Sequence, residues 1–143
     1  MLIRLIYASE ATEPMGPGTV ESLLAHARRK NRLHDLTGLL AFDSRYFLQV
    51  LEGERQIVSD LYGRLVQDPR HKRLVLMQAD PIGERLFFNW SMGFVAADAM
   101  GRERLLRHSA SSRFEPHQMR ASAATALLTE LSRNTESEAT AAA

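Results

Sequence analysis

The order in which two hydrophobic periodicities alternate constrains this chain most strongly. Apolar side chains in a half-buried strand repeat every second residue, whereas on one face of a helix they repeat every three or four. Short breaks separate the periodic runs, among them a loop rich in proline and glycine at 8–18 and Asp68-Pro69. Strand-like runs occupy residues 2–7, 37–42, 46–51, 74–77 and 87–95, and helix-like runs occupy residues 20–31 and 57–66.

The resulting order, β-α-β-β-α-β followed by a fifth strand, is that of a ferredoxin-like α+β sandwich. Several predicted strands are apolar on both faces, so we expect the two helices to cover one face of the sheet. Helical segments near 101–108 and 116–132, or a second subunit, would cover the other. We therefore expect a core domain at 1–97, a C-terminal helical extension at 98–132 and a disordered tail at 133–143, where Ser, Thr, Glu and Ala dominate.

Two primary amides stand where core residues are expected. Gln49 lies within the apolar run 46–51 and shares a strand face with Phe47. Asn31 lies on the predicted buried face of the first helix, near its end. Burying an amide without hydrogen-bond partners costs roughly 2–7 kcal/mol. Gln49 should therefore meet a polar side chain, a buried water or the edge of a flat heteroaromatic ligand.

The composition excludes several functions. The 143 residues suit one domain and contain no cysteine, which excludes disulfides, thiolate metal sites and thiol catalysis. The histidines lack metal-ligand spacing, and no nucleophile elbow or phosphate-binding glycine loop is present, so we expect neither a metal site nor an enzyme. A net charge of +1 gives no overall attraction to nucleic acid or a membrane surface. No run could span a bilayer and no signal peptide is evident, so we expect a cytoplasmic protein.

The charged residues leave alternatives open. Glu52 and Glu54 flank Gly53, where solvated carboxylates are the usual outcome. Basic clusters at 28–32 and 70–73 follow the two helices. Such clusters are usually solvated cations that favour helix C-termini. They could also bind a phosphorylated ligand tail.

Three polar residues could converge between the two helices. Tyr7 from the first strand would lie beside Asn31 and Gln49, giving an oxidisable phenol next to two amides. Such a pocket has no nucleophile and no acid–base pair. It suits the binding of a planar, redox-active ring better than the turnover of a substrate.

Several motifs follow one another along the first two thirds of the chain. They are Tyr7 with Ser9, Asn31, Thr37-Gly38, the run Phe47-Leu48-Gln49-Val50-Leu51-Glu52-Gly53, Asp68-Pro69-Arg70-His71, and Trp90-Ser91-Met92. In this order and spacing, over about residues 1–97, the chain resembles the BLUF domains, blue-light sensors that use FAD. It is similar to the short BLUF proteins, which carry only a helical extension and no catalytic domain.

The resemblance implies that FAD binds non-covalently between the two helices. Asn31 would hydrogen-bond the pyrimidine edge of the flavin ring, and Gln49 would bridge Tyr7 to the flavin. The family pattern implies further FAD-binding residues at Leu23, Ala27, Phe47, Leu65, Asp68, Arg70, His71 and Met92. Ala27 stands where several family members carry serine, and Arg32 where some carry a second asparagine.

The resemblance also implies a photoactive switch made of Tyr7, Gln49, Trp90 and Met92. After blue light excites the oxidised flavin, Tyr7 would donate an electron and a proton, and Gln49 would rotate or tautomerise. The lit state would absorb at slightly longer wavelength. Trp90 and Met92, expected on one face of the fifth strand with Phe88, would relay the change to the C-terminal helices. A homo-oligomer and a downstream signalling protein are the expected partners.

Two other classes of function compete with this interpretation. One is a flavin-independent ferredoxin-like interaction or RNA-binding module, in which Tyr7, Phe47 and Trp90 would form a stacking platform on the sheet. The other is a small flavoenzyme, although the sequence shows no substrate base or nucleophile.

Overall fold

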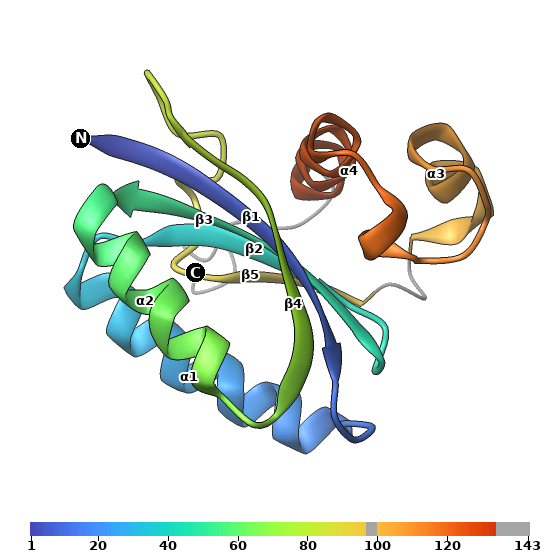
Figure 1. The fold of residues 1–143 in the computed structure, drawn as a ribbon, viewed down its shortest axis with the longest axis horizontal. Helices are drawn as coiled ribbons and strands as arrows, with labels where there is room; N and C mark the ends of the chain where they lie inside the picture. The colour runs from blue at the N-terminus through green and yellow to red at the C-terminus, as the bar shows by residue number, and fades with distance from the viewer. Residues whose placement is uncertain (97–99, 134–143) are drawn as a thin grey trace.

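The computed structural model describes residues 1–96 and 100–133 (Figure 1). The expected domain boundary at 97 and 98 lies outside these residues, as does the expected tail apart from Arg133. The strands are β1 (Leu2–Ala11), β2 (Thr37–Phe42), β3 (Tyr46–Glu54), β4 (His71–Pro81) and β5 (Gly93–Ala96). The helices are α1 (Pro17–Leu33), α2 (Arg55–Gln67), α3 (Gly101–His108), the short 3-10 helix η2 (Pro116–Gln118) and α4 (Ala121–Arg133). Within the described residues, no helix combines the length and apolar character that a membrane crossing requires.

The five strands form one mixed sheet in the order β4-β1-β3-β2-β5. The first four run antiparallel to their neighbours, and β5 runs parallel to β2. This is the expected ferredoxin-like α+β arrangement with a fifth strand added at the edge. In the pairing of β1 with β3, Tyr7 lies directly opposite Gln49. The sheet register alone therefore brings the phenol next to the amide.

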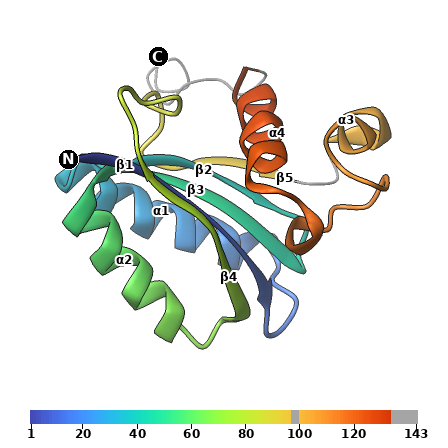
Figure 2. The ribbon, with the colours of Figure 1, turned by 45° about the horizontal axis from the view of Figure 1, so that its top comes forward.

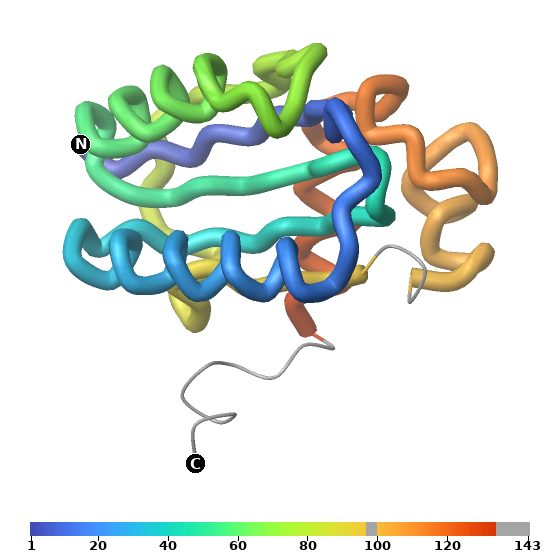
Figure 3. The backbone as a smooth tube through the Cα atoms, turned by 90° about the horizontal axis from the view of Figure 1, so that it is seen from below, coloured from blue at the N-terminus to red at the C-terminus, as the bar shows by residue number. Residues whose placement is uncertain are grey.

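Helices cover both faces of the sheet. Figure 2 shows α1 and α2 on one face and α4 on the other. On the first face, α2 lies over β1 and β4, whereas α1 lies over β2 and β5, so that the strands are visible between the two helices in Figure 3. On the second face, α4 buries Leu127, Leu128 and Leu131 almost completely. The C-terminal helix α4 is therefore one of the covers that the sequence predicted for this face.

The side chains of β1 and β3 alternate between two hydrophobic clusters. Tyr7 and Leu51 belong to the cluster under α1 and α2. Ile6, Leu48 and Val50 belong to the cluster under α4. This alternation is the one that the strand periodicity predicts, and it directs Gln49 toward the face covered by α1 and α2.

The first helix begins earlier than expected. The helix-like run was predicted at 20–31, but Gly16 is the N-cap residue and Pro17 occupies the first helical turn. Proline suits this position because its ring fixes a helical φ and because the first N–H groups of a helix have no partner within it. The second helix ends at Gln67, immediately before Asp68-Pro69, as predicted.

The fifth strand is shorter than expected. It begins at Gly93 rather than at 87. Phe88 is 65% exposed, Trp90 packs in the cluster under α4, and Met92 packs in the cluster under α1 and α2. The expectation that these three side chains share one strand face is therefore wrong.

A buried carboxylate explains this irregular path. Glu52 is fully buried, whereas we expected a solvated side chain. Its carboxylate accepts hydrogen bonds from the backbone N–H groups of Leu86 and Phe87, at 3.1 and 2.7 Å. Because these N–H groups bind a side chain, they cannot pair with a neighbouring strand. Arg4 completes the arrangement through an ion pair of 2.9 Å from Nε to the same carboxylate.

Candidate functional site

A cavity of about 300 Å³ lies between α1, α2 and the sheet. Its volume falls at the lower end of the range of about 300–1,000 Å³ that is typical of small-molecule sites. All eleven residues for which the sequence implied contact with a cofactor line this cavity: Tyr7, Leu23, Ala27, Asn31, Phe47, Gln49, Leu65, Asp68, Arg70, His71 and Met92. Trp90 does not, because it lies on the other side of the sheet.

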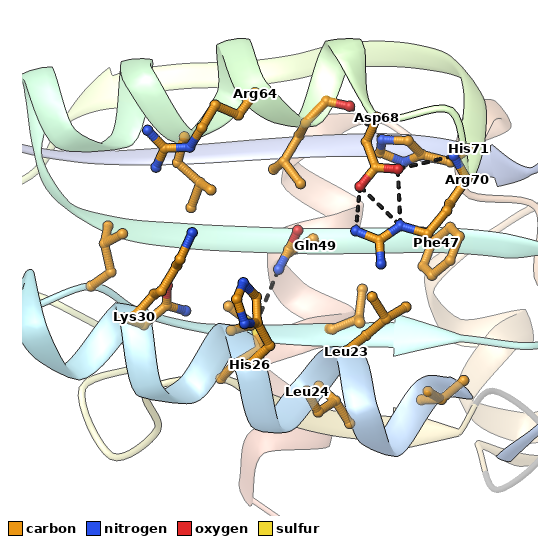
Figure 4. A pocket seen from close by; sticks show the side chains of 18 of the residues that line it. Leu23, Leu24, His26, Lys30, Phe47, Gln49, Arg64, Asp68, Arg70 and His71 are labelled. Atoms are coloured by element: carbon orange, nitrogen blue, oxygen red, sulfur yellow. Dashed lines mark hydrogen bonds and ion pairs between the residues drawn. The ribbon is translucent and has the colours of Figure 1, made fainter. Parts of the chain in front are cut away.

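Gln49 lies at the centre of a hydrogen-bonded chain at the floor of the cavity (Figure 4). The hydroxyl of Tyr7 donates to Gln49 Oε1. At its other end, Gln49 Nε2 donates to the sulfur of Met92 over 3.3 Å. Gln49 is only 9% exposed, so both ends of its amide have found partners inside the protein. The polar partner predicted for this buried amide is thus Tyr7.

The environment of Tyr7 keeps its phenol protonated. The side chain is 3% exposed. Burial raises the pKa of the Tyr7 phenol well above its ordinary value, and the neighbouring Tyr62 and Asp68 raise it further. Desolvation has this effect because it disfavours the charged phenolate. Tyr7 is therefore a neutral hydrogen-bond donor to Gln49 throughout the ordinary pH range.

Asn31 connects α1 to the segment that precedes β5. Its side chain is 4% exposed and lines the cavity. Its Nδ2 donates to the carbonyl oxygen of Ser91 over 2.6 Å. One amide therefore contributes to the wall of the cavity and also holds the chain that carries Met92.

His71 uses both ring nitrogens within the protein. Nε2 lies 2.6 Å from the carbonyl oxygen of Leu65, and Nδ1 lies 2.9 Å from the hydroxyl of Ser9. A carbonyl oxygen only accepts, so Nε2 carries the hydrogen. His71 can therefore contact a ligand in the cavity only through its ring carbons. Its ring also meets that of Phe47 edge to face.

Charged side chains surround the opening of the cavity. Asp68 and Arg70 form an ion pair at one end (Figure 4). The hydrogen bonds from Arg70 lower the pKa of Asp68 to about 2. Lys30 from α1 and Arg64 from α2 extend into the space between the helices at the other end.

The sequence interpretation did not single out His26, His34 or Arg64, and it considered Lys30 only as part of the basic cluster at 28–32. His26, Lys30 and His34 line the cavity from one side of α1, and Arg64 lines it from α2. The spacing of four residues in the first group was a usable signal, because it places the three side chains in one row along a helix. Arg64 offered no comparable pattern.

The lining suits a planar ring that has a polar edge and carries an anionic tail. The walls are apolar and include Leu23, Leu65 and Phe47. Asn31 and Gln49 supply amide groups that match the alternating donors and acceptors of a heteroaromatic edge. The cations at the opening could neutralise phosphate groups.

Comparison with known proteins agrees with this geometry. The family model for BLUF, described as sensors of blue-light using FAD, matches residues 2–93. The chain is 36% identical over 86 residues to the photoactivated adenylate cyclase subunit beta of Euglena gracilis, covering 60% of this chain and 10% of that protein. It is 36% identical over 87 residues to the blue light- and temperature-regulated antirepressor BluF of Escherichia coli K12, covering 61% of this chain and 22% of that protein.

A solved structure resembles the chain over nearly its whole length. The photo-activated state of BlsA superposes with a TM-score of 0.82 at 28% sequence identity, covering 96% of this chain and 98% of that chain. In contrast, the alignments with the two curated relatives span 10% and 22% of their lengths. The similarity to those relatives therefore concerns a minor part of each.

Proposed function

Because the chain belongs to the BLUF family of blue-light sensors that use FAD, we propose that it binds FAD between α1 and α2 and responds to blue light by rearranging the hydrogen bonds of Gln49. A BLUF domain is a photosensory domain and is not itself catalytic. The observation that carries the proposal is the chain from the Tyr7 hydroxyl through the Gln49 amide to Met92 sulfur, which lies along the cavity.

The residues of the cavity fit the parts of FAD. Asn31 and Gln49 would bind the polar edge of the flavin ring, and Leu23, Ala27, Phe47 and Leu65 would form its apolar walls. Arg70, held by Asp68, would lie along the tail, and Lys30 supplies a further cation at the opening. When bound, oxidised flavin absorbs blue light and in its excited state accepts an electron from a nearby phenol.

Tyr7 is the phenol that lies on the cavity and has a proton acceptor in place. Loss of an electron makes a phenol strongly acidic, so its proton leaves along the existing hydrogen bond to Gln49 Oε1. Gln49 can then rotate or tautomerise, because an amide carries donors at one end and an acceptor at the other. The electron and the proton return to Tyr7 as Gln49 rearranges, so no net electron transfer remains in the lit state, and recovery in the dark only restores the original orientation of Gln49.

Met92 and Trp90 provide a route from the cavity to the opposite face of the sheet. Reorientation of Gln49 would remove the hydrogen bond to Met92 sulfur. Two residues earlier, Trp90 is 4% exposed and packs in the cluster that includes Leu127 and Leu128 of α4. We propose that movement of Met92 shifts Trp90, and that α4 carries the change to a second copy of the chain and to a signalling partner. In this proposal the core domain comprises residues 1–97, and the C-terminal extension that carries α4 comprises residues 98–132.

The RNA-binding alternative is disfavoured. It required Tyr7, Phe47 and Trp90 to be exposed on one face of the sheet, but they are 3%, 8% and 4% exposed. Aromatic rings that are buried among core residues cannot stack on the bases of an RNA strand.

Substitution of Gln49 tests the proposal. Gln49→Leu keeps the side-chain volume, so the protein should retain FAD but lose the reversible red shift on illumination. Gln56→Leu is the matched control, because Gln56 is exposed on α2 and does not line the cavity. It should behave as the wild type does. Tyr7→Phe should likewise bind FAD without forming the red-shifted state.

Two outcomes would reject the proposal. A wild-type photocycle in Gln49→Leu would remove Gln49 from the mechanism. Mass spectrometry of the flavin released from purified protein identifies the cofactor, and release of FMN alone would reject the assignment of FAD.

A further inference from the structure

Three successive carbonyl groups hold the segment that carries Met92. The carbonyl oxygen of Trp90 accepts from the backbone N–H of Gly38 over 3.1 Å. That of Ser91 accepts from Asn31 Nδ2 over 2.6 Å. That of Met92 accepts from Arg28 Nε over 2.8 Å. The sheet thus provides one of these bonds, and side chains of α1 provide the other two.

Arg28 belongs to the basic cluster at 28–32, for which the sequence left open a solvated surface or a contact with a phosphorylated ligand tail, but it differs from its neighbours. Its side chain is partly buried and points toward the segment before β5, whereas Arg29 and Lys30 are exposed. Arg28 precedes Asn31 by three residues, so the two side chains emerge from the same side of the helix. A guanidinium that donates to a carbonyl makes a stronger hydrogen bond than a neutral donor does.

Met92 is consequently restrained at both ends. Its backbone carbonyl is bound by Arg28, and its sulfur accepts from Gln49 Nε2. The terminal methyl group of Met92 also packs against β2. A Cβ atom added to Gly38 would lie only 3.2 Å from Met92 Cε. Hydrogen bonds to a thioether are weak. The bond from Arg28 is therefore the stronger of the two polar restraints on this residue.

We propose that Arg28 is a positioning residue, which holds Met92 against Gln49 in the dark and anchors the backbone of Met92 while its side chain moves in the lit state. The inference rests on the proposed role of Gln49. When Gln49 reorients, its Nε2 leaves the sulfur of Met92, but the carbonyl of Met92 stays bound to Arg28. The hydrogen bond from Gln49 to Met92 can then re-form without a backbone movement of the 90–92 segment. Without Arg28, Met92 drifts during the lit state and has to return before Gln49 can recover its partner.

Arg28 acts from outside the cavity, and this makes the inference testable. It is absent from the residues that line the cavity, so Arg28→Ala leaves the binding surface intact. Flavin content and the size of the initial red shift should stay at wild-type values. Recovery in the dark should slow roughly tenfold, which corresponds to about 1.4 kcal/mol in the barrier. Arg28→Lys keeps a charged donor and should restore most of the rate.

Arg29→Ala is the matched control, because it removes the same charge from an exposed position one residue away. Recovery in Arg28→Ala that is as fast as in Arg29→Ala, or faster, overturns the proposal. If Arg28→Ala fails to fold, Arg28→Leu, compared with Arg29→Leu, removes the same N–H donor while keeping an aliphatic side chain at this position. Absence of a red shift in the wild type would instead reject the proposed function.

A dark-state measurement tests the contact independently of photochemistry. The chain has 6 methionines, so methyl-labelled methionine gives few NMR signals, and Met92→Leu identifies the one from Met92. In Arg28→Ala this signal should move while the others stay in place, and in Arg29→Ala it should not move. An unchanged Met92 signal in Arg28→Ala would refute the positioning role.

Discussion

Glu52 should be among the residues of this sheet that tolerate substitution least. Its carboxylate is fully buried on the side of β3 opposite Gln49. One oxygen accepts from Phe87 N at 2.7 Å, and the other accepts from Leu86 N at 3.1 Å and Arg4 Nε at 2.9 Å. This single side chain therefore fixes the start of the segment that leads to Trp90.

The cost of Glu52→Gln follows from these contacts. The amide oxygen can keep the bond from Phe87, but its NH₂ group would face the donors of Leu86 and Arg4. Loss of the charge-assisted bond from Arg4 costs about 1.5–3 kcal/mol, and leaving the N–H of Leu86 unpaired costs about 1–3 kcal/mol. The sum, roughly 2.5–6 kcal/mol, includes the cost of about 3–5 kcal/mol for removing one member of a buried ion pair. For a domain of this size it should lower the melting temperature by roughly 10 °C or more.

Thermal unfolding followed by circular dichroism, with all variants saturated with FAD, measures this loss. Trp90 provides a local readout, because it is the only tryptophan of the chain and is 4% exposed. Its emission in Glu52→Gln should shift toward that of a hydrated indole. Glu54→Gln is the control, since Glu54 is half exposed and pairs with the N-terminal amine. Exposed ion pairs contribute little. The reasoning is wrong if Glu52→Gln has the same melting temperature as Glu54→Gln and leaves the Trp90 emission unchanged.

The remaining predictions concern the opening of the cavity and the output. Asp68→Asn should lower the stability of the protein near neutral pH. Hydrogen bonds from Arg70 depress the pKa of Asp68 to about 2. The stabilising negative charge is therefore fully present above the ordinary carboxyl pKa and is lost as the pH falls through about 2. The urea unfolding midpoints of Asp68→Asn and the wild type should therefore converge as the pH is lowered. A difference in midpoint that does not change with pH would refute this. Met92→Ala should keep the red shift but weaken the light-induced change in Trp90 emission and in hydrogen exchange of α4. An undiminished response would reject the relay through Met92.

The hydrophobic periodicity predicted the parts of the fold that local sequence determines. It assigned the faces of β1 and β3, and it directed Tyr7 and Gln49 to the same face. The family motifs then identified residues that the structure brings around one cavity. The face assignments succeeded because strand alternation fixes which side chains share a face.

The path of residues 83–92 could not be predicted in the same way. Its apolar alternation resembles a strand, yet the carboxylate of Glu52 binds two of its N–H groups and diverts the chain. Glu52 itself was misinterpreted because it stands beside Gly53, where exposed carboxylates are common. Arg28 was hidden among other cations, and only the tertiary structure distinguishes a cation that binds a carbonyl from one that is solvated.

The absorption spectrum of the FAD-loaded protein, recorded before and after blue illumination, tests the central claim most directly. The account predicts a reversible shift of the flavin band to longer wavelength, without bleaching of the oxidised flavin, that decays in the dark and is absent from Gln49→Leu. Protein that takes up no flavin, or that binds FAD and shows an unchanged spectrum after illumination, would contradict it.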